Sequence, residues 1–250
     1  MSNLGTGGSA FDATLYNSPT VSTSDKKVGS AAMAFVSSSS QYIQIPALTI
    51  GSSGLSFAFW FKSSSSVDWA RVFDFGNTPP GVDTSNNNVY FAIKSNDVDI
   101  NSFPPVTDPY HQSGIFKQNV NDGVWRHAVW TIDVSGNWLV YLNGALVCTF
   151  NSIVYPPVMS RAYNYLGKSG WASDPYLNGA IDEFYMFYSV LSASQVTALY
   201  TMMVPTSTPT SRPSSLPSAQ PSSLPSAAPT TGETRVLRVE MIAAYRLLPS

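Results

Sequence analysis

The sequence predicts an all-β fold: a two-sheet antiparallel jelly-roll sandwich with one short C-terminal helix, followed by a disordered Pro/Ser linker. Three observations lead to this prediction. Short runs rich in β-branched and aromatic residues recur between residues 31 and 188, separated by Gly, Pro, Asn and Ser. One capped apolar segment follows near residue 193. Proline then recurs at every fourth position from Pro205 to Pro229.

The predicted strands follow one another at short intervals. The strongest is Leu55–Lys62 (LSFAFWFK), which is apolar at nearly every position and indicates burial on both faces or an amphiphilic outer face. Residues 1–30 carry few strand signals, and Pro104 and Pro105 exclude a central strand from the weak segment 95–120. Besides the meander described next, further strands are predicted at 31–36, 41–45, 71–75, 89–94, 163–167 and 180–188.

The segment 121–150 predicts a meander of three strands. Its runs Val124–Thr131 and Trp138–Leu142 have the composition of a half-buried pleated surface. Asn143-Gly144 lies between two apolar runs and is the strongest two-residue hairpin signal, because both positions accept positive φ. Ser135-Gly136-Asn137 provides the other turn. Such a meander cannot bury its face alone, so a second sheet must cover it.

The domain organisation follows from the shifts in composition. Ser192–Gln195 matches a capping box and predicts a helix over 193–201. The prolines after it favour extended, polyproline-II-like conformations and leave no apolar face, which is typical of a semi-rigid linker. We expect a flexible N-terminus at 1–10, a jelly-roll domain at 11–204, a Pro/Ser-rich linker at 205–231 and a truncated or unassigned segment at 232–250.

Composition narrows the class of protein. The chain is 44% hydrophobic, enough to fill a sizeable core, and its net charge of −2 offers no basic surface for nucleic acid. No transmembrane segment is expected, because no window approaches the ~18 consecutive apolar residues of a span. The single cysteine, Cys148, excludes an internal disulfide and should be a buried apolar residue. The Pro/Ser stalk is typical of secreted or surface proteins, so we expect an extracellular or cell-surface location, as a fragment of a larger secreted or membrane-anchored protein.

Three stretches within 11–200 resemble one family. The first comprises the early strands in Gly29–Ile45 and Phe57–Lys62. The second, Gly123–Gly144, contains DGVWRHAVWTID and WLVYLNG, and the third, Leu166–Tyr200, combines a Gly-rich turn, Asp-Pro, a Gly-x-Ile-Asp-Glu strand and a Leu-Ser capped helix. On these residues the chain resembles LamG-like (concanavalin A-like lectin/glucanase, pentraxin-related) jelly-roll domains. The resemblance implies two antiparallel sheets packed face to face.

Some members of this superfold are glycoside hydrolases, whose reaction usually needs two carboxylates beside the scissile bond. Those hydrolases resemble each other in a Glu-x-Asp-x-x-Glu strand, which this chain lacks. Glu183 is the only glutamate before residue 204, and its neighbour Asp182 should point to the opposite face of their strand. His127 lies within a predicted strand, where a satisfied structural role is expected. We therefore expect no enzyme activity.

Calcium is left open as a cofactor, and no metal ligands are assigned. The resemblance to pentraxins implies calcium ligands in an early loop, which here holds Asp68, and after a Leu-Gly, where this chain has Lys168-Ser169-Gly170 without a carboxylate. An EF-hand-like spacing is interrupted by proline and lacks flanking helices, so a solvated acidic loop is the better interpretation. The residues with that spacing are Asp97, Asp99, Asn101 and Asp108.

Carbohydrate recognition uses exposed aromatic side chains that stack on sugar faces, beside polar groups that bind the hydroxyls. Trp69 and Trp171 fall in predicted loops; the alternative for each is packing under its own loop. The remaining tryptophans, Trp60, Trp125, Trp130 and Trp138, fall in predicted strands and should be core or sheet-surface residues. The predicted ligand-binding residues are Asp68, Trp69, Arg71, Trp171, Asp174 and Tyr176.

The leading hypothesis from the sequence is a non-catalytic extracellular ligand-binding or adhesion module. Its expected partner is a carbohydrate, or a glycosylated or protein ligand. The alternatives are a structural spacer domain without a ligand and, third, a glycoside hydrolase.

Overall fold

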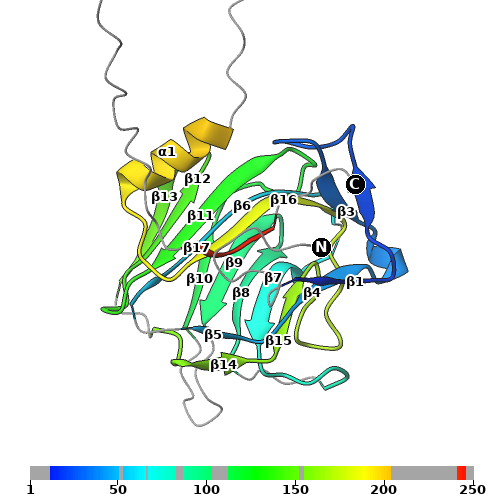
Figure 1. Cartoon of the computed structure of the whole chain (residues 1–250), viewed down its shortest axis with the longest axis horizontal. Coiled ribbons are helices and arrows are strands. Elements are labelled where there is room, and N and C mark those ends of the chain that lie inside the picture. The colour runs from blue at the N-terminus through cyan, green and yellow to red at the C-terminus, as the bar shows by residue number, and fades with distance from the viewer. Residues whose placement is uncertain are drawn as a thin grey trace, which may run out of the picture.

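The computed structural model describes residues 12–50, 53–65, 67–82, 87–102, 112–151, 155–203 and 241–245. These residues form two large antiparallel sheets, with an α-helix lying across one end of the larger sheet (Figure 1). The all-β sandwich with one short helix is therefore confirmed. The expected N-terminal segment 1–10 and the linker 205–231 lie outside the described residues.

The first sheet has seven strands in the described part of the chain. β7 to β10 follow one another as a meander, so one continuous stretch of chain builds half of this sheet. Across the sheet the strands are β1 (Thr14–Tyr16), β4 (Tyr42–Ile45), β15 (Tyr163–Leu166), β7 (Ala70–Gly76), β8 (Val89–Lys94), β9 (Asp97–Ser102) and β10 (Gln112–Phe116).

The second sheet contains the predicted meander. Its order is β13 (Ala145–Phe150), β12 (Trp138–Leu142), β11 (Arg126–Ile132), β6 (Leu55–Ser63), β16 (Gly179–Phe187), β3 (Ala32–Phe35) and β2 (Thr20–Ser22), with β17 (Met241–Tyr245) also paired to β16. A small separate sheet joins β5 (Leu48–Ile50) to β14 (Met159–Arg161). The 3₁₀ turn η2 (Ser37–Ser39) lies in the connection from β3 to β4.

The core between the two sheets is built largely from phenylalanine rings. Phe57 and Phe59 on β6 lie 4.5 and 5.7 Å, centroid to centroid, from Phe73 on β7 of the facing sheet. Phe184 on β16 stacks at 5.6 Å on Phe59. All four rings are almost completely buried, and each contributes about 2 kcal/mol of apolar burial. These contacts, rather than backbone pairing, fasten one sheet to the other.

The outer face of β6 is covered by α1 (Ala193–Met203). Ala58 packs in one cluster with Val129 of β11 and Val196 of the helix, and the Trp60 ring lies 5.8 Å from that of Tyr200. The prediction that 55–62 is buried on both faces is therefore confirmed. No helix in the described residues is long and apolar enough to span a membrane, and α1 has only 11 residues.

The turns of the meander follow the predicted chemistry. Asn143 and Gly144 have φ of 50° and 81°, as a type I′ hairpin requires. A Cβ on Gly144 would also lie 2.9 Å from the ring of Tyr200, so the packing of α1 independently requires glycine there. At the other turn, the Asp133 carboxylate accepts hydrogen bonds from the backbone N–H groups of Ser135 and Asn137, at 2.8 and 2.9 Å.

The capping box of α1 is present in full. The Ser192 N–H donates to Gln195 Oε1 at 2.8 Å, and the Gln195 N–H donates to Ser192 Oγ at 3.3 Å. The helix ends at Met203, two residues beyond the prediction, a difference within the usual uncertainty of helix ends.

Seven strands of the described residues were not predicted, and one of them, β17, lies in the segment 232–250 that was left unassigned. β1, β2, β5 and β14 have three residues each, too few to show a period of two. β1 and β2 form at the edges of β4 and β3, whereas β5 and β14 pair with each other. β9 and β10 lie in the segment 95–120, whose prolines fall between the two strands rather than within either. The prolines correctly indicated a break between strands, but the prediction that the segment 95–120 contains no central strand was wrong.

Candidate functional site

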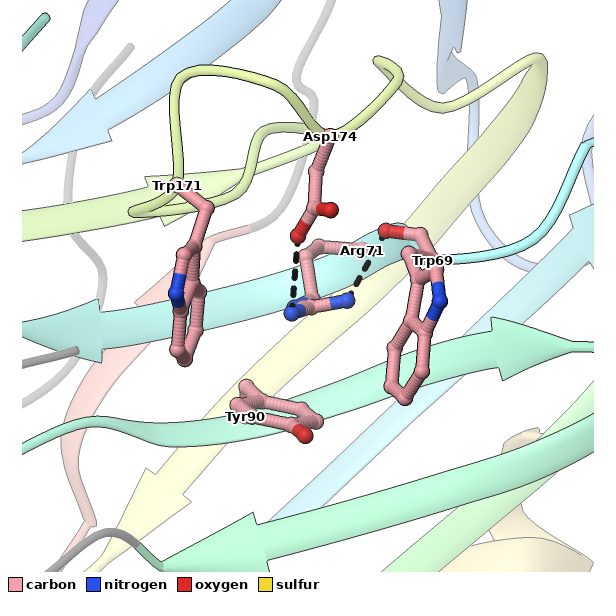
Figure 2. A pocket seen from close by; sticks show the side chains of 5 residues that line it. All are labelled: Trp69, Arg71, Tyr90, Trp171 and Asp174. Carbon is pink, nitrogen blue, oxygen red and sulfur yellow. Dashed lines mark hydrogen bonds and ion pairs between the residues drawn. The ribbon is translucent and has the colours of Figure 1, made fainter. Parts of the chain in front are cut away.

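A pocket of about 210 Å³ opens on the outer face of the seven-stranded sheet. Tyr90 belongs to this face because its neighbours Val89 and Phe91 on β8 both point into the core. Figure 2 shows the indole rings of Trp69 and Trp171 on either side of the pocket, the Arg71 guanidinium between them, Tyr90 below and Asp174 above.

A β-bulge aims Arg71 into the pocket. Strict alternation would place Arg71 on the same side of β7 as Phe73, in the core. The register of β7 against β8 shifts between these two residues, and Val72 takes the core position instead. The bulge thus turns a long cationic side chain outward without unpairing the strand.

The Arg71 guanidinium is 2% exposed and its charge is balanced locally. Its Nη2 lies 3.0 Å from Asp174 Oδ2, and its Nε lies 3.5 Å from Asp74 Oδ2. Its Nη1 donates a 2.8 Å hydrogen bond to the carbonyl oxygen of Trp69. The guanidinium carbon is 4.0 Å from the ring centroid of Tyr90, so the floor of the pocket is a cation–π stack.

The two tryptophans stand beside this stack, half exposed. The Trp69 and Trp171 centroids lie 5.5 and 5.2 Å from the Arg71 guanidinium carbon, and Trp171 meets the Tyr90 ring edge to face at 5.9 Å. Lys94 Nζ lies 4.0 Å from the Trp69 ring centroid. Trp69 is held by two cations, and Trp171 by one cation and one ring, so each indole keeps its orientation while part of its surface remains exposed.

Trp69 adopts a left-handed backbone conformation, with φ of 73°. Such a conformation is costly for an aromatic residue and is kept only where the surroundings enforce it. Its N–H donates to the carbonyl oxygen of Ile93 at 2.8 Å, and the preceding Asp68 accepts hydrogen bonds from the N–H and the hydroxyl of Ser95 at 2.6 and 3.0 Å. Asp68 therefore fixes the loop that presents Trp69.

The loop 167–178 presents Trp171 and Asp174. Ser169 Oγ donates to Asp174 Oδ2 at 2.7 Å and accepts the Trp171 N–H at 3.0 Å, so one hydroxyl positions both. The Gly170 N–H donates to Asp74 Oδ2 at 2.8 Å. A Cβ at Gly170 would lie 2.6 Å from Asn88 Nδ2, which explains the glycine.

Two acids beneath the pocket are buried. Burial raises the pKa of Asp74, although Arg71 and hydrogen bonds from Gly170 and Asn88 oppose the shift. Burial also raises the pKa of Asp99, which interacts with the Tyr90 hydroxyl, and it raises the pKa of Tyr90 itself. The two acids, Asp74 and Asp99, support the floor of the pocket from below and are not among the described residues that line it.

Four of the six predicted site residues, Trp69, Arg71, Trp171 and Asp174, come together in this pocket. Asp68 lies beside it and is engaged by Ser95. Tyr176 lies instead in a neighbouring group of tyrosines, 6.0 Å from the ring of Tyr42. Sequence reasoning missed Tyr90. The alternation within Val89–Lys94 would have placed that ring on the outer face.

A sequence model of the concanavalin A-like lectin/glucanases superfamily matches residues 37–197. The chain belongs to this superfamily. A search of the curated proteins found no match.

Solved structures with the same fold include domain 4 of AbnA, a GH43 extracellular arabinanase from Geobacillus stearothermophilus, in complex with arabinotriose (21% identity, TM-score 0.57, 76% of this chain and 89% of that one). The binding domain of Paraclostridial Mosquitocidal Protein 1 is similar at 10% identity and TM-score 0.58 (77% and 47%). The binding domain of Botulinum Neurotoxin DC in complex with SialylT is similar at 14% identity and TM-score 0.56 (77% and 46%). The chain thus spans about half of each toxin binding domain.

The superfamily's hydrolases require paired carboxylates, and Asp182 and Glu183 do not follow the regular alternation from which opposite faces were predicted. A bulge between Asp182 and Tyr185 breaks the alternation of β16, with Glu183 at φ 50°, and the Tyr185 hydroxyl donates to the Glu183 carboxylate. The two acids therefore cannot be assigned to opposite faces. Both are 3% exposed, and Asp182 Oδ2 accepts the N–H groups of Lys27 and Val28. They belong to the packing of β16.

His127 and Cys148 also differ from expectation. His127 is fully buried between the rings of Trp60 and Tyr200, as expected for a residue with a structural role. The expected hydrogen bonds of its imidazole are not found, because neither ring nitrogen has a partner in the described residues. Burial lowers its pKa to about 4. Cys148 is half-buried on β13 rather than buried, and burial raises its pKa.

The EF-hand-like acids do not form a loop. Asp97, Asp99 and Asn101 lie in β9, and Asp99 and Asn101 are each 2% exposed, so a solvated acidic loop is wrong for them. Asp108 lies outside the described residues. Within the described ranges, no group of three His, Cys, Asp or Glu side chains is placed to hold a metal ion.

Proposed function

We propose that this protein is a non-catalytic carbohydrate-binding module, and that the pocket between Trp69 and Trp171 binds a neutral sugar ring. The observation that carries the proposal is a pair of half-exposed indoles on either side of a charge-balanced polar floor. An aromatic wall packs against the C–H face of a sugar, while the polar floor meets its hydroxyls.

Asp174 and Arg71 supply the hydrogen bonds in this arrangement. Asp174 Oδ2 is occupied by Ser169 and Arg71, whereas Oδ1 makes no hydrogen bond to a described residue. A sugar hydroxyl can therefore donate to Oδ1. Because the guanidinium is already paired with two carboxylates, it offers no unpaired positive charge to an anionic ligand, so the pocket favours a neutral ligand.

The absence of catalysis is part of the proposal. Asp174 is the one carboxylate among the described residues that line the pocket. A glycosidase needs a second, protonated carboxyl group across the bond. Binding rather than hydrolysis is also the role named for the toxin binding domains of the same fold, and the arabinanase domain was solved with arabinotriose. An extracellular adhesion role for the whole protein fits the same proposal.

A glycan array followed by calorimetry on the best ligand tests the proposal. Trp69→Ala and Trp171→Ala should each weaken binding by roughly 30-fold, which corresponds to the ~2 kcal/mol typical of a buried aromatic anchor. Trp125→Ala is the matched control. Trp125 is also half-exposed beside a lysine, Lys62 at 5.7 Å, but it precedes β11 of the other sheet.

The outcomes separate the hypotheses. If Trp125→Ala binds like the wild type and both pocket variants do not, the pocket is the site. If no glycan binds, the proposal fails and the structural spacer becomes the better interpretation. Release of reducing ends from a bound polysaccharide would instead identify a hydrolase.

A further inference from the structure

A second aromatic group lies on the same sheet face. We call it the tyrosine cluster, comprising Tyr16, Tyr42, Tyr165, Tyr176 and Lys168. The Tyr16 and Tyr42 rings stack in parallel, with centroids 4.6 Å apart and planes 2° from coplanar. Tyr165 meets Tyr42 edge to face at 5.6 Å. Tyr16 is 38% exposed, Tyr42 and Tyr176 are half-buried, and Tyr165 is buried beneath them.

Strand pairing links the cluster to the pocket. Tyr165 pairs with Asp74 on β7, and Asp74 pairs with Tyr90 on β8, so one row of outward-facing residues runs from the cluster to the pocket floor. From β4 to β8 there are three strand spacings, a span of about 14 Å. The loop 167–178 borders both sites, contributing Lys168 and Tyr176 to the cluster and Trp171 and Asp174 to the pocket.

The two sites differ in charge balance. Lys168 Nζ lies 4.0 Å from the ring centroid of Tyr165 and 5.5 Å from that of Tyr42. Its hydrogen bond goes to the carbonyl oxygen of Ser169 at 3.3 Å, and no carboxylate of the described residues lies within ion-pair distance. Burial lowers the pKa of Lys168, and the charge of Asp74, which lies beyond ion-pair distance, opposes this shift only in part. Arg71, by contrast, is paired with two acids.

The surroundings of Lys168 indicate which kind of ligand could bind there. A partly desolvated ammonium group is stabilised by an anion that approaches from the open side. No hydrogen bond joins the hydroxyls of Tyr16, Tyr42 or Tyr176 to the described residues, which leaves donors and acceptors for sugar hydroxyls beside an aromatic surface. Positive charge, phenol groups and exposed ring faces together match a sugar that carries a carboxylate or a sulfate.

We propose that the tyrosine cluster is a second subsite of the binding face, which takes an anionic sugar residue of the same glycan chain whose neutral residue occupies the Trp69/Trp171 pocket. This inference rests on the proposed carbohydrate-binding function. The protein then recognises an oligosaccharide that contains both neutral and anionic residues. The pocket binds a neutral residue, and Lys168 binds an anionic one.

The test uses the whole chain and matched pairs of oligosaccharides on one array. The pairs are uronic-acid oligomers with their methyl esters, sulfated galactan oligomers with their desulfated forms, and sialylated glycans with their desialylated forms. Wild-type protein should prefer the anionic member of the bound pair by about fivefold, the upper range for a partly exposed ion pair. The pair that shows the preference distinguishes carboxylate from sulfate.

Lys168→Met keeps the alkyl stem and removes the charge. It should abolish the preference while affinity for the neutral member stays within about twofold, and Lys168→Arg should restore the preference. An unchanged melting temperature shows that the variant is folded. If the wild type binds both members equally, or if Lys168→Met keeps the preference, the subsite is refuted and the pocket stands. If no oligosaccharide binds, the proposed function and the subsite both fail.

Discussion

The ion pairs of Arg71 lead to a specific stability prediction. Arg71→Met preserves most of the apolar stem, but removes the guanidinium that stacks on Tyr90 and faces Asp74 and Asp174. Asp74 is 0% exposed and keeps only its neutral donors, the Gly170 N–H at 2.8 Å and Asn88 Nδ2 at 2.6 Å. Leaving a buried carboxylate without its cation should lower the free energy of unfolding by about 3–5 kcal/mol at pH 7.

Urea unfolding of a double-mutant cycle measures this. Asp74→Asn in the Arg71→Met background removes the stranded charge while keeping the side-chain shape, so it should recover about half of the loss. Asp174→Asn should recover less, because the Asp174 side chain is 16% exposed and water solvates it in part. A loss below about 0.5 kcal/mol for Arg71→Met, or no rescue by Asp74→Asn, would refute the account of the pocket floor.

The pH dependence gives a second readout of the same variant. Burial already raises the pKa of Asp74 and Arg71 opposes that shift, so removing Arg71 raises the pKa further. The folded state of the variant then binds the proton more tightly than the unfolded chain does. Its free energy of unfolding should therefore increase, relative to wild type, as the pH falls from neutral toward the unfolded pKa of Asp74. Asp74→Asn should abolish this difference.

Three further predictions address other residues. Burial lowers the pKa of His127 to about 4 in the folded protein, against about 6.5 in the unfolded chain, so its contribution to stability is complete above the unfolded pKa and is lost as the pH falls between these two values. Urea unfolding at several pH values should show a loss of about 3 kcal/mol, which should be absent in His127→Phe. Asn143→Ala should lower the free energy of unfolding by about 1–2 kcal/mol, because alanine disfavours a φ of 50° and loses the 3.0 Å hydrogen bond that Asn143 Oδ1 accepts from the His127 N–H. Asn143→Gly should lower it by less, as measured by urea unfolding. Gly170→Ala should displace Asn88 and weaken glycan binding about tenfold through Trp171, and an unchanged affinity by calorimetry would show that this loop tolerates the shift.

Much of the fold could be predicted because its signals are local. The continuous apolar run of 55–62, the Asn143-Gly144 turn and the capping box at Ser192 each specify their geometry within a few residues, and the structure confirms all three. Strands of three residues carry no such signal. β1 forms by pairing with β4, and β14 forms by pairing with β5, so neither strand can be recognised from its own residues alone.

The candidate site shows the same division. Two tryptophans in predicted loops, with Arg and Asp residues nearby, were recognisable in the sequence, and the fold brings Trp69, Arg71, Trp171 and Asp174 into one pocket. The sequence could not show that a bulge turns Arg71 out of the core, nor that Tyr90 lies beneath it. Bulges depend on the register between two strands, and register is a property of the pair rather than of either strand.

The sequence by itself therefore determined the class of fold, the turns, the helix cap and the aromatic composition of the candidate site, because propensity, periodicity and capping act over a few neighbouring residues. Only the tertiary structure decided which charges are balanced. Arg71 is paired with acids three and 103 positions away along the chain, whereas Lys168 is left among tyrosine rings. Electrostatic pairing depends on distance in space, and the sandwich brings β7, β8 and the loop 167–178 together only when both sheets are complete.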